Sequence, residues 1–491
     1  MTAMSGDESR IEFSKPLTAH ETTIPGVVLY DLPVHGDNRG WFKENWQRQK
    51  MGALGLPDFA PVQNNVSFNA TAGTTRGIHA EPWDKYISVA TGRIFGAWVD
   101  LRQGPTFGAV ATAELDPSRA VFVPRGVGNA FQTLQDGTAY TYLVNDHWSA
   151  EAQGEYTFLN LADETVAIPW PIPLEDAELS EKDRAHPRLA DVEPMRPKKV
   201  LVLGAGGQLG KALRNAYGAD DSPAAVDFAS RSEFDLADPD SYASRDWSQY
   251  STIINAAAYT AVDKAETPEG RRDAWAVNAA AVAKLARVAA EHRITLVNVS
   301  SDYVFDGTVA VHAEDEPFSP LGVYGQSKAA GDAAVGALPR HYTVRTSWVI
   351  GDGDNFVRTM ARLAAREVNP AVVDDQFGRP TFTEDLAAAI RYLLDTRAPY
   401  GTYNLSCSGE VASWADVAAE VFAVLGRHPG DIQRTTTAAY FADKPGAAPR
   451  PLNSALDLRK IEATGFIPHR WEDRLRTYLG ADDQVRVPQG R

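Results

Sequence analysis

Cysteine is almost missing from this sequence, with Cys407 the single thiol in 491 residues. One cysteine excludes a disulfide within the chain, so a disulfide-stapled secreted fold is ruled out. The polar N-terminus lacks the apolar core of a signal peptide, and no apolar run approaches the roughly 18 residues of a membrane span. We therefore expect a protein of the cytoplasm.

Positive charge is also scarce. The chain carries 48 Lys and Arg against 64 Asp and Glu, a net charge of −16. Of this excess, residues 1–195 hold −11, from 15 basic and 26 acidic side chains. Such a balance argues against a nucleic-acid or anionic-membrane surface. We expect small-molecule substrates, with no nucleic-acid or membrane partner.

Helical periodicity is absent from the first third of the chain. Residues 24–168 contain short apolar runs, such as "AVFVPRG" and "TAYTYLVND", separated by Gly, Pro, Asn and Asp. This pattern is typical of an all-β sandwich or barrel. A proline- and charge-rich stretch follows from residue 171 to residue 199. We place one domain at 1–187 and a linker at 188–198.

From residue 199 onward, apolar runs alternate with alanine-rich helical segments. Alternation of this kind predicts a parallel, doubly wound α/β sheet, and the chain beyond residue 350 is expected to form a small substrate lobe. We therefore place a second domain at 199–491.

The second domain opens with a strand followed by "GAGGQLG", residues 204–210. Glycines at this spacing permit a tight turn and let backbone N–H groups and a helix N-terminus approach a pyrophosphate. Later, "VYGQSK" places Tyr324 and Lys328 four residues apart, on one face of a helix. A tyrosine beside an ammonium can protonate the alkoxide formed when hydride reduces a ketone, and Ser301 can hydrogen-bond the same oxygen.

Seven stretches in this half occur in the order and spacing of the dTDP-4-dehydrorhamnose reductases, which are extended short-chain dehydrogenases. They are "GAGGQLG", "NAAAYTAVDKAE", "SSDYVFDG", "YGQSK", "RTSWVIG", "DQFGRPT" and "PRPLNSAL". The resemblance covers about Lys199 to Gly480 and implies a Rossmann fold with Ser301, Tyr324 and Lys328 as the catalytic triad.

The same resemblance implies two sets of binding residues. The nicotinamide cofactor would contact Gly204, Gly207, Gln208, Leu209, Asp235, Ala257, Ala258, Tyr324 and Lys328. The substrate would contact Asp302, Tyr303, Trp348, Asn355 and Arg379. The second strand ends in "VDFASRSEF", where an acidic residue would favour NADH and Ser230 with Arg231 would accept a 2′-phosphate. We favour NADPH over NADH.

The first 195 residues resemble the dTDP-4-dehydrorhamnose 3,5-epimerases, which are cupin-like jelly rolls. The matching stretches are "DNRGWFKENW", "VQNNVSFN", "TRGIHAEPWDK", "VDLRQGPTFG", "VPRGVGNAFQTL", "TYLVND" and "LSEKD". Epimerisation beside a ketone needs a base, a cation for the enolate oxygen and an acid on the opposite face. By motif, His79 is the base oriented by Asp183, Lys85 stabilises the enolate, and Tyr142 returns the proton.

This resemblance also implies nucleotide and sugar contacts and a homodimer formed through the N-terminal domain. The contacts are Arg39, Glu44, Gln63, Asn65, Arg76, Asn129, Trp148 and Lys182. No metal is expected in either domain. The sequence departs from the epimerase pattern at two positions, where Asn129 replaces a histidine and Gly96 an aspartate.

Three functions remain open at this point. The chain is a bifunctional enzyme that converts dTDP-4-dehydro-6-deoxy-D-glucose into dTDP-L-rhamnose; or it is a reductase with a catalytically silent cupin-like domain, as the two departures suggest; or both activities are present and yield a related 6-deoxy-hexose.

Overall fold

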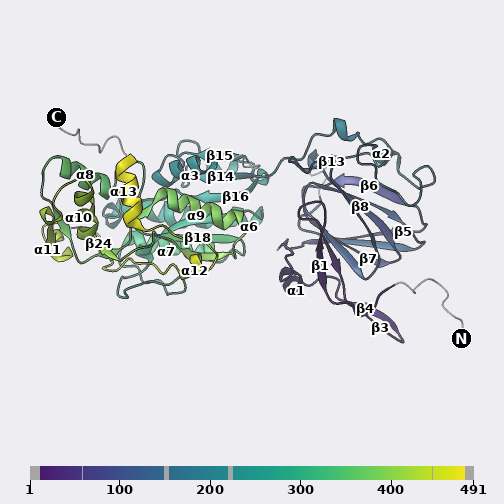
Figure 1. The fold of residues 1–491 in the computed structure, drawn as a ribbon, viewed down its shortest axis with the longest axis horizontal. Helices are drawn as coiled ribbons and strands as arrows, with labels where there is room; N and C mark the ends of the chain where they lie inside the picture. Colours follow the sequence, from purple (N-terminus) through teal and green to yellow (C-terminus); the bar gives the residue numbers. More distant parts are fainter. Residues whose placement is uncertain (1–10, 58, 149–153, 219–224, 445, 482–491) are drawn as a thin grey trace. The chain divides into compact units, whose positions relative to one another are not determined.

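Short antiparallel strands build the first of two units into which the chain divides, Met1–Pro197 and Lys198–Arg491 (Figure 1). The computed structural model describes residues 11–57, 59–148, 154–218, 225–444 and 446–481. Within these residues, no helix has the length and apolar character needed to cross a membrane.

Two antiparallel sheets face each other in the first unit. The six-stranded sheet has the order β1 (Thr18–Glu21), β2 (Val28–Asp31), β10 (Arg119–Val123), β7 (Lys85–Thr91), β12 (Thr138–Val144) and β5 (Gln63–Asn69). The five-stranded sheet has the order β13 (Thr157–Phe158), β6 (Thr75–Ala80), β11 (Val127–Thr133), β8 (Ile94–Asp100) and β9 (Val110–Leu115). Ile87 and Val121 of one sheet pack with Trp98 and Phe131 of the other, so the core lies between them. The predicted all-β jelly roll is confirmed.

The outer faces of both sheets are also covered. Helix α1 (Arg48–Gly52) places Met51 over the six-stranded sheet, against Tyr86 and Phe122. A long return segment covers the five-stranded sheet and carries α2 (Glu181–Arg184) and the 3₁₀ turn Leu189–Asp191. The segment 188–198, which the sequence analysis treats as a linker, contributes buried Val192 and Met195 to this layer. A hairpin of β3 (Val34–Asp37) and β4 (Gly40–Lys43) completes the unit.

The second unit is built on a six-stranded parallel sheet. Its order is β15 (Val226–Ala229), β14 (Lys199–Leu203), β16 (Tyr250–Asn255), β17 (Thr295–Ser301), β18 (His341–Thr346) and β23 (Gly401–Asn404). The chain order reverses at β14, with β15 on one side and β16 on the other. Ligands of doubly wound sheets bind at this switch point, beyond the carboxyl ends of the strands.

Helices cover both faces of the parallel sheet, as the alternating sequence pattern predicts. Helices α3 (Gln208–Gly218) and α9 (Thr383–Asp395) pack on one face, and α6 (Ala281–Glu291) and α7 (Val323–Gly336) on the other. Smaller elements of this part are α4 (Pro239–Ala243), α5 (Pro268–Trp275), the π-helical turn Ala276–Ala280 and α12 (Arg459–Glu462).

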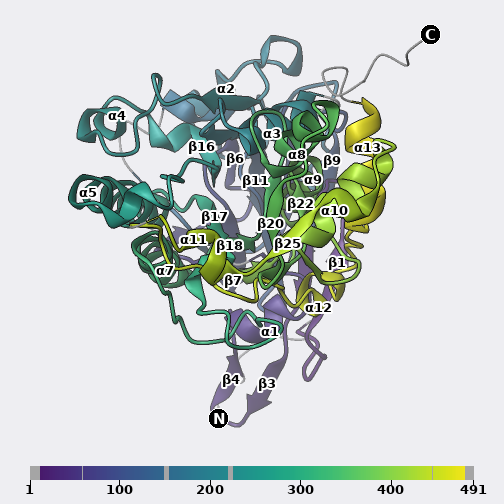
Figure 2. The same ribbon diagram turned by 90° about the vertical axis from the view of Figure 1, so that its left-hand side faces the viewer.

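A smaller lobe with its own core follows residue 350 (Figures 1 and 2). It contains α8 (Phe356–Ala365), α10 (Trp414–Val424), α11 (Thr437–Phe441) and α13 (Trp471–Ala481). The lobe also contains three two-stranded sheets. They pair β19 (Val349–Ile350) with β22 (Thr381–Phe382), β20 (Ala371–Val373) with β25 (Gln433–Thr435), and β21 (Phe377–Gly378) with β24 (Ala412–Ser413). Ser413 and Asp416 form a capping box that fixes the start of α10.

Candidate active sites

A cleft in the first unit collects most of the polar side chains predicted for epimerisation. It consists of two adjoining cavities of about 440 and about 520 Å³. Both are lined by His79, Glu81 and Tyr142. We call the two together the epimerase cleft.

His79 and Asp183 form a hydrogen-bonded pair in this cleft. His79 lies on β6, and its Nε2 is 3.0 Å from Oδ1 of Asp183 on α2. Ser180 fixes the start of α2 by accepting a hydrogen bond from the Asp183 backbone N–H. Burial raises the pKa of Asp183, but the hydrogen bond and charge of His79 outweigh it, so the pKa lies below its usual value. An ionised carboxylate on one ring nitrogen orients the ring and leaves Nδ1 to take a proton.

Lys85 and Tyr142 lie together on adjacent strands of the six-stranded sheet. The Lys85 ammonium is 5.6 Å from the centroid of the Tyr142 ring. Burial, together with the nearby charge of Glu81, raises the pKa of Tyr142 to about 12 against the opposing effect of Arg76. Tyr142 therefore holds its proton at neutral pH, as a general acid must.

Two titratable groups, one lining the cleft and one beside it, were not predicted from the sequence. Glu81 contacts Lys85, with 2.7 Å between Oε1 and Nζ. His186 is buried, stacks on Phe158, and places Nε2 3.9 Å from Asp183 Oδ1. His186 looks like an ordinary loop residue in the sequence, and only the fold brings it to His79. Glu81 lies two residues after His79, so the alternation of side chains along β6 is the signal that could have found it.

His79, Asp183 and His186 also form a group that can ligate a divalent ion. One ligand atom from each lies within 4.8 Å of the others. The direct hydrogen bond between His79 and Asp183 makes the set equally suitable as an acid–base pair with a second imidazole beside it.

The two departures from the epimerase pattern are filled by one network of side chains. A Cβ at Gly96 would lie 2.8 Å from two ring atoms of Trp98, so the indole occupies the space of the missing side chain. Trp98 Nε1 donates to Asn129 Oδ1, and Asn129 Nδ2 donates to the Tyr140 hydroxyl, each at 3.0 Å. Tyr140 in turn packs against Tyr142, with 5.6 Å between the ring centroids.

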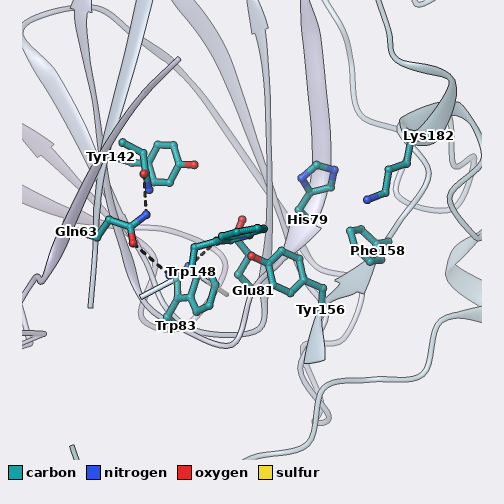
Figure 3. Close-up of a pocket in the computed structure, with 10 residues that line it drawn as sticks. Gln63, His79, Glu81, Trp83, Tyr142, Trp148, Tyr156, Phe158 and Lys182 are labelled. Carbon is teal, nitrogen blue, oxygen red and sulfur yellow. Dashed lines mark hydrogen bonds between the residues drawn. The ribbon is translucent and has the colours of Figure 1, made fainter. Parts of the chain in front are cut away.

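The predicted nucleotide and sugar contacts divide into two groups. Gln63, Asn65, Trp148 and Lys182 line the first cavity (Figure 3), and Arg76 and Asn129 line the second. Arg39 and Glu44 are not among the residues that line these cavities. Arg39 lies at the tip of the β3–β4 hairpin, paired with Asp37 and 84% exposed, and Glu44 pairs with Lys50.

In the second unit, the glycine turn lies between β14 and α3, at the switch point of the sheet. Gly204 has φ +81°, and a Cβ there would be 2.7 Å from the Ala257 nitrogen. A Cβ at Gly210 would be 2.3 Å from the Gly204 oxygen. These two glycines close the turn. Gly206 leaves open space above it, and a Cβ at Gly207 would make only an ordinary contact, 3.4 Å from the Gly204 oxygen. Gln208 and Leu209 then begin α3, whose N-terminal N–H groups suit a pyrophosphate.

The remaining predicted cofactor residues surround this turn. Ala257 and Ala258 follow β16, the strand beside β14. Asp235 lies in the loop after β15, where its Oδ2 accepts a hydrogen bond from Arg231. Ser230 and Arg231 come directly after β15, and Arg231 is 85% exposed. A hydroxyl and an exposed guanidinium at this strand end suit a 2′-phosphate.

The structure brings Ser301, Tyr324 and Lys328 together at the carboxyl end of β17. The Lys328 ammonium donates to the Val299 carbonyl oxygen at 2.7 Å. Burial lowers the pKa of Lys328 to about 8, while Asp332 acts to raise it. Burial and the charge of Asp302 raise the pKa of Tyr324 to about 12, and a hydrogen bond with Ser301 acts in the opposite direction.

The predicted substrate contacts of the second unit have different surroundings. Asp302 and Tyr303 follow Ser301 directly, and the Tyr303 ring packs edge-on against Tyr324 at 5.6 Å. Trp348 stacks on Trp414 at 3.8 Å. Asn355 caps α8, and its amide donates to the Gly351 and Gly353 carbonyls; the Arg379 guanidinium donates to the Gly409 and Leu456 carbonyls.

Comparison with known proteins finds a family for each unit. Residues 198–483 match the family model of the RmlD substrate binding domain, and residues 21–191 match that of dTDP-4-dehydrorhamnose 3,5-epimerase. The chain belongs to both families.

Individual relatives show the same division of this epimerase–reductase chain. The RmlC homolog of Streptococcus pyogenes serotype M6 is 52% identical over 38% of this chain and 98% of its own length. The dTDP-4-dehydrorhamnose reductase of Aggregatibacter actinomycetemcomitans is 38% identical over 57% of this chain and 97% of its own length. A solved dTDP-4-dehydrorhamnose reductase from Bacillus anthracis str. Ames, in complex with NADP, is 30% identical over 58% of this chain and 99% of that one, with a TM-score of 0.52. An epimerase domain and a reductase domain are thus present in one chain, as the sequence predicts.

Proposed function

We propose that this protein carries out two consecutive steps, the 3,5-epimerisation of dTDP-4-dehydro-6-deoxy-D-glucose and the NADPH-dependent reduction of the C4 ketone, giving dTDP-L-rhamnose. One observation carries the proposal. A His79–Asp183 pair facing Lys85 and Tyr142 lies in the same chain as a Tyr324–Lys328 pair beside a nucleotide-binding turn. The product of the first arrangement is the substrate of the second.

In the epimerase cleft, His79 takes the proton α to the ketone, and Asp183 stabilises the imidazolium that forms. The Lys85 ammonium stabilises the enolate oxygen, because a charge placed where negative charge develops lowers the barrier. Tyr142 then donates its proton from the other face, which inverts the carbon.

In the reductase domain, the cofactor supplies hydride to C4 when it is bound. Tyr324 donates the proton to the new alkoxide, and Ser301 hydrogen-bonds the same oxygen. Lys328, held by the Val299 carbonyl, stabilises the tyrosinate that remains. Ser230 and Arg231 favour NADPH, the cofactor of the NADP-bound relative. We also propose a cytoplasmic location, because nucleotide sugars and NADPH are made and consumed there.

Proton exchange in D₂O tests the epimerase step without any cofactor. With dTDP-4-dehydro-6-deoxy-D-glucose, NMR should show deuterium entering at carbons 3 and 5. His79→Ala should abolish exchange and leave reduction of pre-epimerised substrate intact. Tyr324→Phe should leave proton exchange intact and lower the rate of reduction by about 10²–10⁴-fold, the usual contribution of one general-acid step. Each variant is the control for the other.

A reductase with a silent N-terminal domain is the second candidate, and the Trp98–Asn129–Tyr140 network favours it, since it replaces two polar groups of the family pattern. If the protein reduces pre-epimerised substrate but exchanges neither proton above the enzyme-free rate, this second function is correct.

We further propose a homodimer formed through the first unit. β5 is an edge strand, and Val66 and Phe68 are exposed on it at 67% and 66%. Apolar side chains on an open edge are stabilised by pairing with a second chain. Arg39 and Glu44 do not line the cleft of their own chain, and in such a dimer they would be available to the cleft of the partner subunit. Light scattering should give twice the chain mass, and Phe68→Glu should halve it; a wild-type monomer at micromolar concentration contradicts the proposal.

A further inference from the structure

Glu81 introduces a negative charge where the proposed reaction needs a positive one. Its carboxylate is 2.7 Å from the Lys85 ammonium, and both side chains are nearly buried, at 11% and 6% exposure. The second carboxylate oxygen accepts a hydrogen bond from Trp83 Nε1 at 2.5 Å. The backbone of Glu81 is also fixed, because its carbonyl accepts from Gly126 N–H.

A buried ammonium needs such a partner. Removing a lysine side chain from water favours its neutral form, and a neutral amine cannot stabilise an enolate. A carboxylate in direct contact restores the charged form, and it draws Nζ to one position above the Tyr142 ring. Glu81 thus acts on the cation of the cleft.

Glu81 also faces the acid of the cleft. It lines both cavities together with Tyr142 and His79, and Figure 3 shows the three residues in the first cavity. Its charge raises the pKa of Tyr142, and it acts in the same direction on the neighbouring Tyr140 and Tyr156. Charged and titratable groups from four elements face Glu81. They are Arg76 and His79 of β6, Lys85 of β7, Tyr140 and Tyr142 of β12, and Tyr156, which precedes β13.

We propose that Glu81 is a positioning residue of the epimerase cleft, whose carboxylate holds the Lys85 ammonium as a charged group and places a negative charge beside the proton donor, Tyr142. The proposal rests on the function proposed above. It gives one residue an influence on both the electrostatic stabiliser and the proton donor.

The test compares Glu81→Gln with the wild-type protein over pH 6–9.5. Glutamine keeps the size and the hydrogen-bonding capacity of the side chain but not its charge. The rate of exchange at carbons 3 and 5 should fall with rising pH in the variant, by at least tenfold at pH 9, while remaining within a few-fold of wild type at pH 6. Glu81→Asp should recover part of the alkaline rate. Glu114→Gln, at an exposed position of β9, removes the same charge from the same unit and should leave the profile unchanged.

A second measurement separates this proposal from the proposed function. In protein labelled with [¹³Cζ]tyrosine, the resonance that disappears in Tyr142→Phe belongs to Tyr142, and its titration midpoint should be lower in Glu81→Gln. That shift is measurable even in a protein that exchanges no substrate proton. Superimposable exchange profiles, or an unchanged Tyr142 midpoint, would overturn the role of Glu81. Reduction of pre-epimerised substrate reports that each variant chain is intact.

Discussion

At the scale of single residues, the position of the Trp98 indole explains why residue 96 is glycine. The indole lies where any side chain at position 96 would begin, and its N–H is used by Asn129. The sequence reveals that two polar groups are missing, but only the fold shows that a tryptophan two positions along the same strand takes their place.

Gly96→Ala should destabilise the first unit by about 1–3 kcal/mol, because an added methyl in a packed core forces its neighbours to move. Trp98 is fully buried and cannot swing into solvent. Chemical denaturation followed by tryptophan fluorescence measures the change. In a Trp98→Leu background the same substitution should cost less, and an equal cost in both backgrounds would contradict the steric explanation.

The buried Lys328 should give the reductase a characteristic pH dependence. Burial lowers its pKa to about 8, so the ammonium form, which stabilises the tyrosinate, is lost as pH rises through that value. Reduction of pre-epimerised substrate should therefore decline above about pH 8. Lys328→Arg keeps a charge at every accessible pH and should shift or remove this alkaline limb, whatever its effect on the maximal rate. A flat wild-type profile from pH 7 to 10 would argue against the role of Lys328.

At the scale of secondary structure, the sequence predicts those parts of the site whose residues are neighbours along the chain. The strand, glycine turn and helix of residues 199–218 follow one another directly, and Tyr324 and Lys328 share a face because helix geometry fixes four-residue spacing. His186 carries no such local signal, because it reaches His79 and Asp183 only when the segment after α2 folds against β6. Glu81 lies two residues after His79 and four before Lys85, so strand alternation places it near them, but its contact with the Lys85 ammonium is visible only in the structure.

The glycine turn allows two kinds of glycine to be told apart by experiment. Gly210→Ala should push α3 away from the turn, since its Cβ would meet the Gly204 oxygen at 2.3 Å, and should lower both thermal stability and NADPH affinity. Gly206→Ala meets no atom within 4 Å and should leave stability unchanged while weakening NADPH binding, where the pyrophosphate approaches the backbone. Gly218→Ala, at the exposed end of α3, is the matched control. Differential scanning fluorimetry and NADPH fluorescence give the two readouts.

At the scale of the whole molecule, the two units have separate cores. The jelly roll closes around Trp98 and Ile87, and the parallel sheet packs its helices around Leu213 and Leu285, with the division between Pro197 and Lys198. The domain order and both fold classes were predictable, because strand-rich and alternating patterns occupy separate halves of the sequence. The packing of Val192 and Met195 onto the first unit could not be predicted. A proline- and charge-rich stretch resembles a linker, because the sequence does not show which residues its few apolar side chains contact.

Calorimetry should accordingly resolve two unfolding transitions in this chain, and NADPH should raise only one of them, because a ligand stabilises the unit that binds it. At 100 times its dissociation constant the stabilisation is about 2.7 kcal/mol. His79→Ala and Tyr324→Phe should leave both transitions in place. A single transition that moves as a whole with NADPH would mean that the two units unfold together.

The joining of two self-contained cores in one polypeptide fixes the ratio of the two catalysts at one to one. Changes in transcription, translation or turnover then alter both capacities by the same factor. The steady-state amount of the intermediate that passes between the two steps then depends on the ratio of two catalytic efficiencies, which the active-site residues of each unit determine. A substitution that slows one unit therefore cannot be offset by making more of that unit alone.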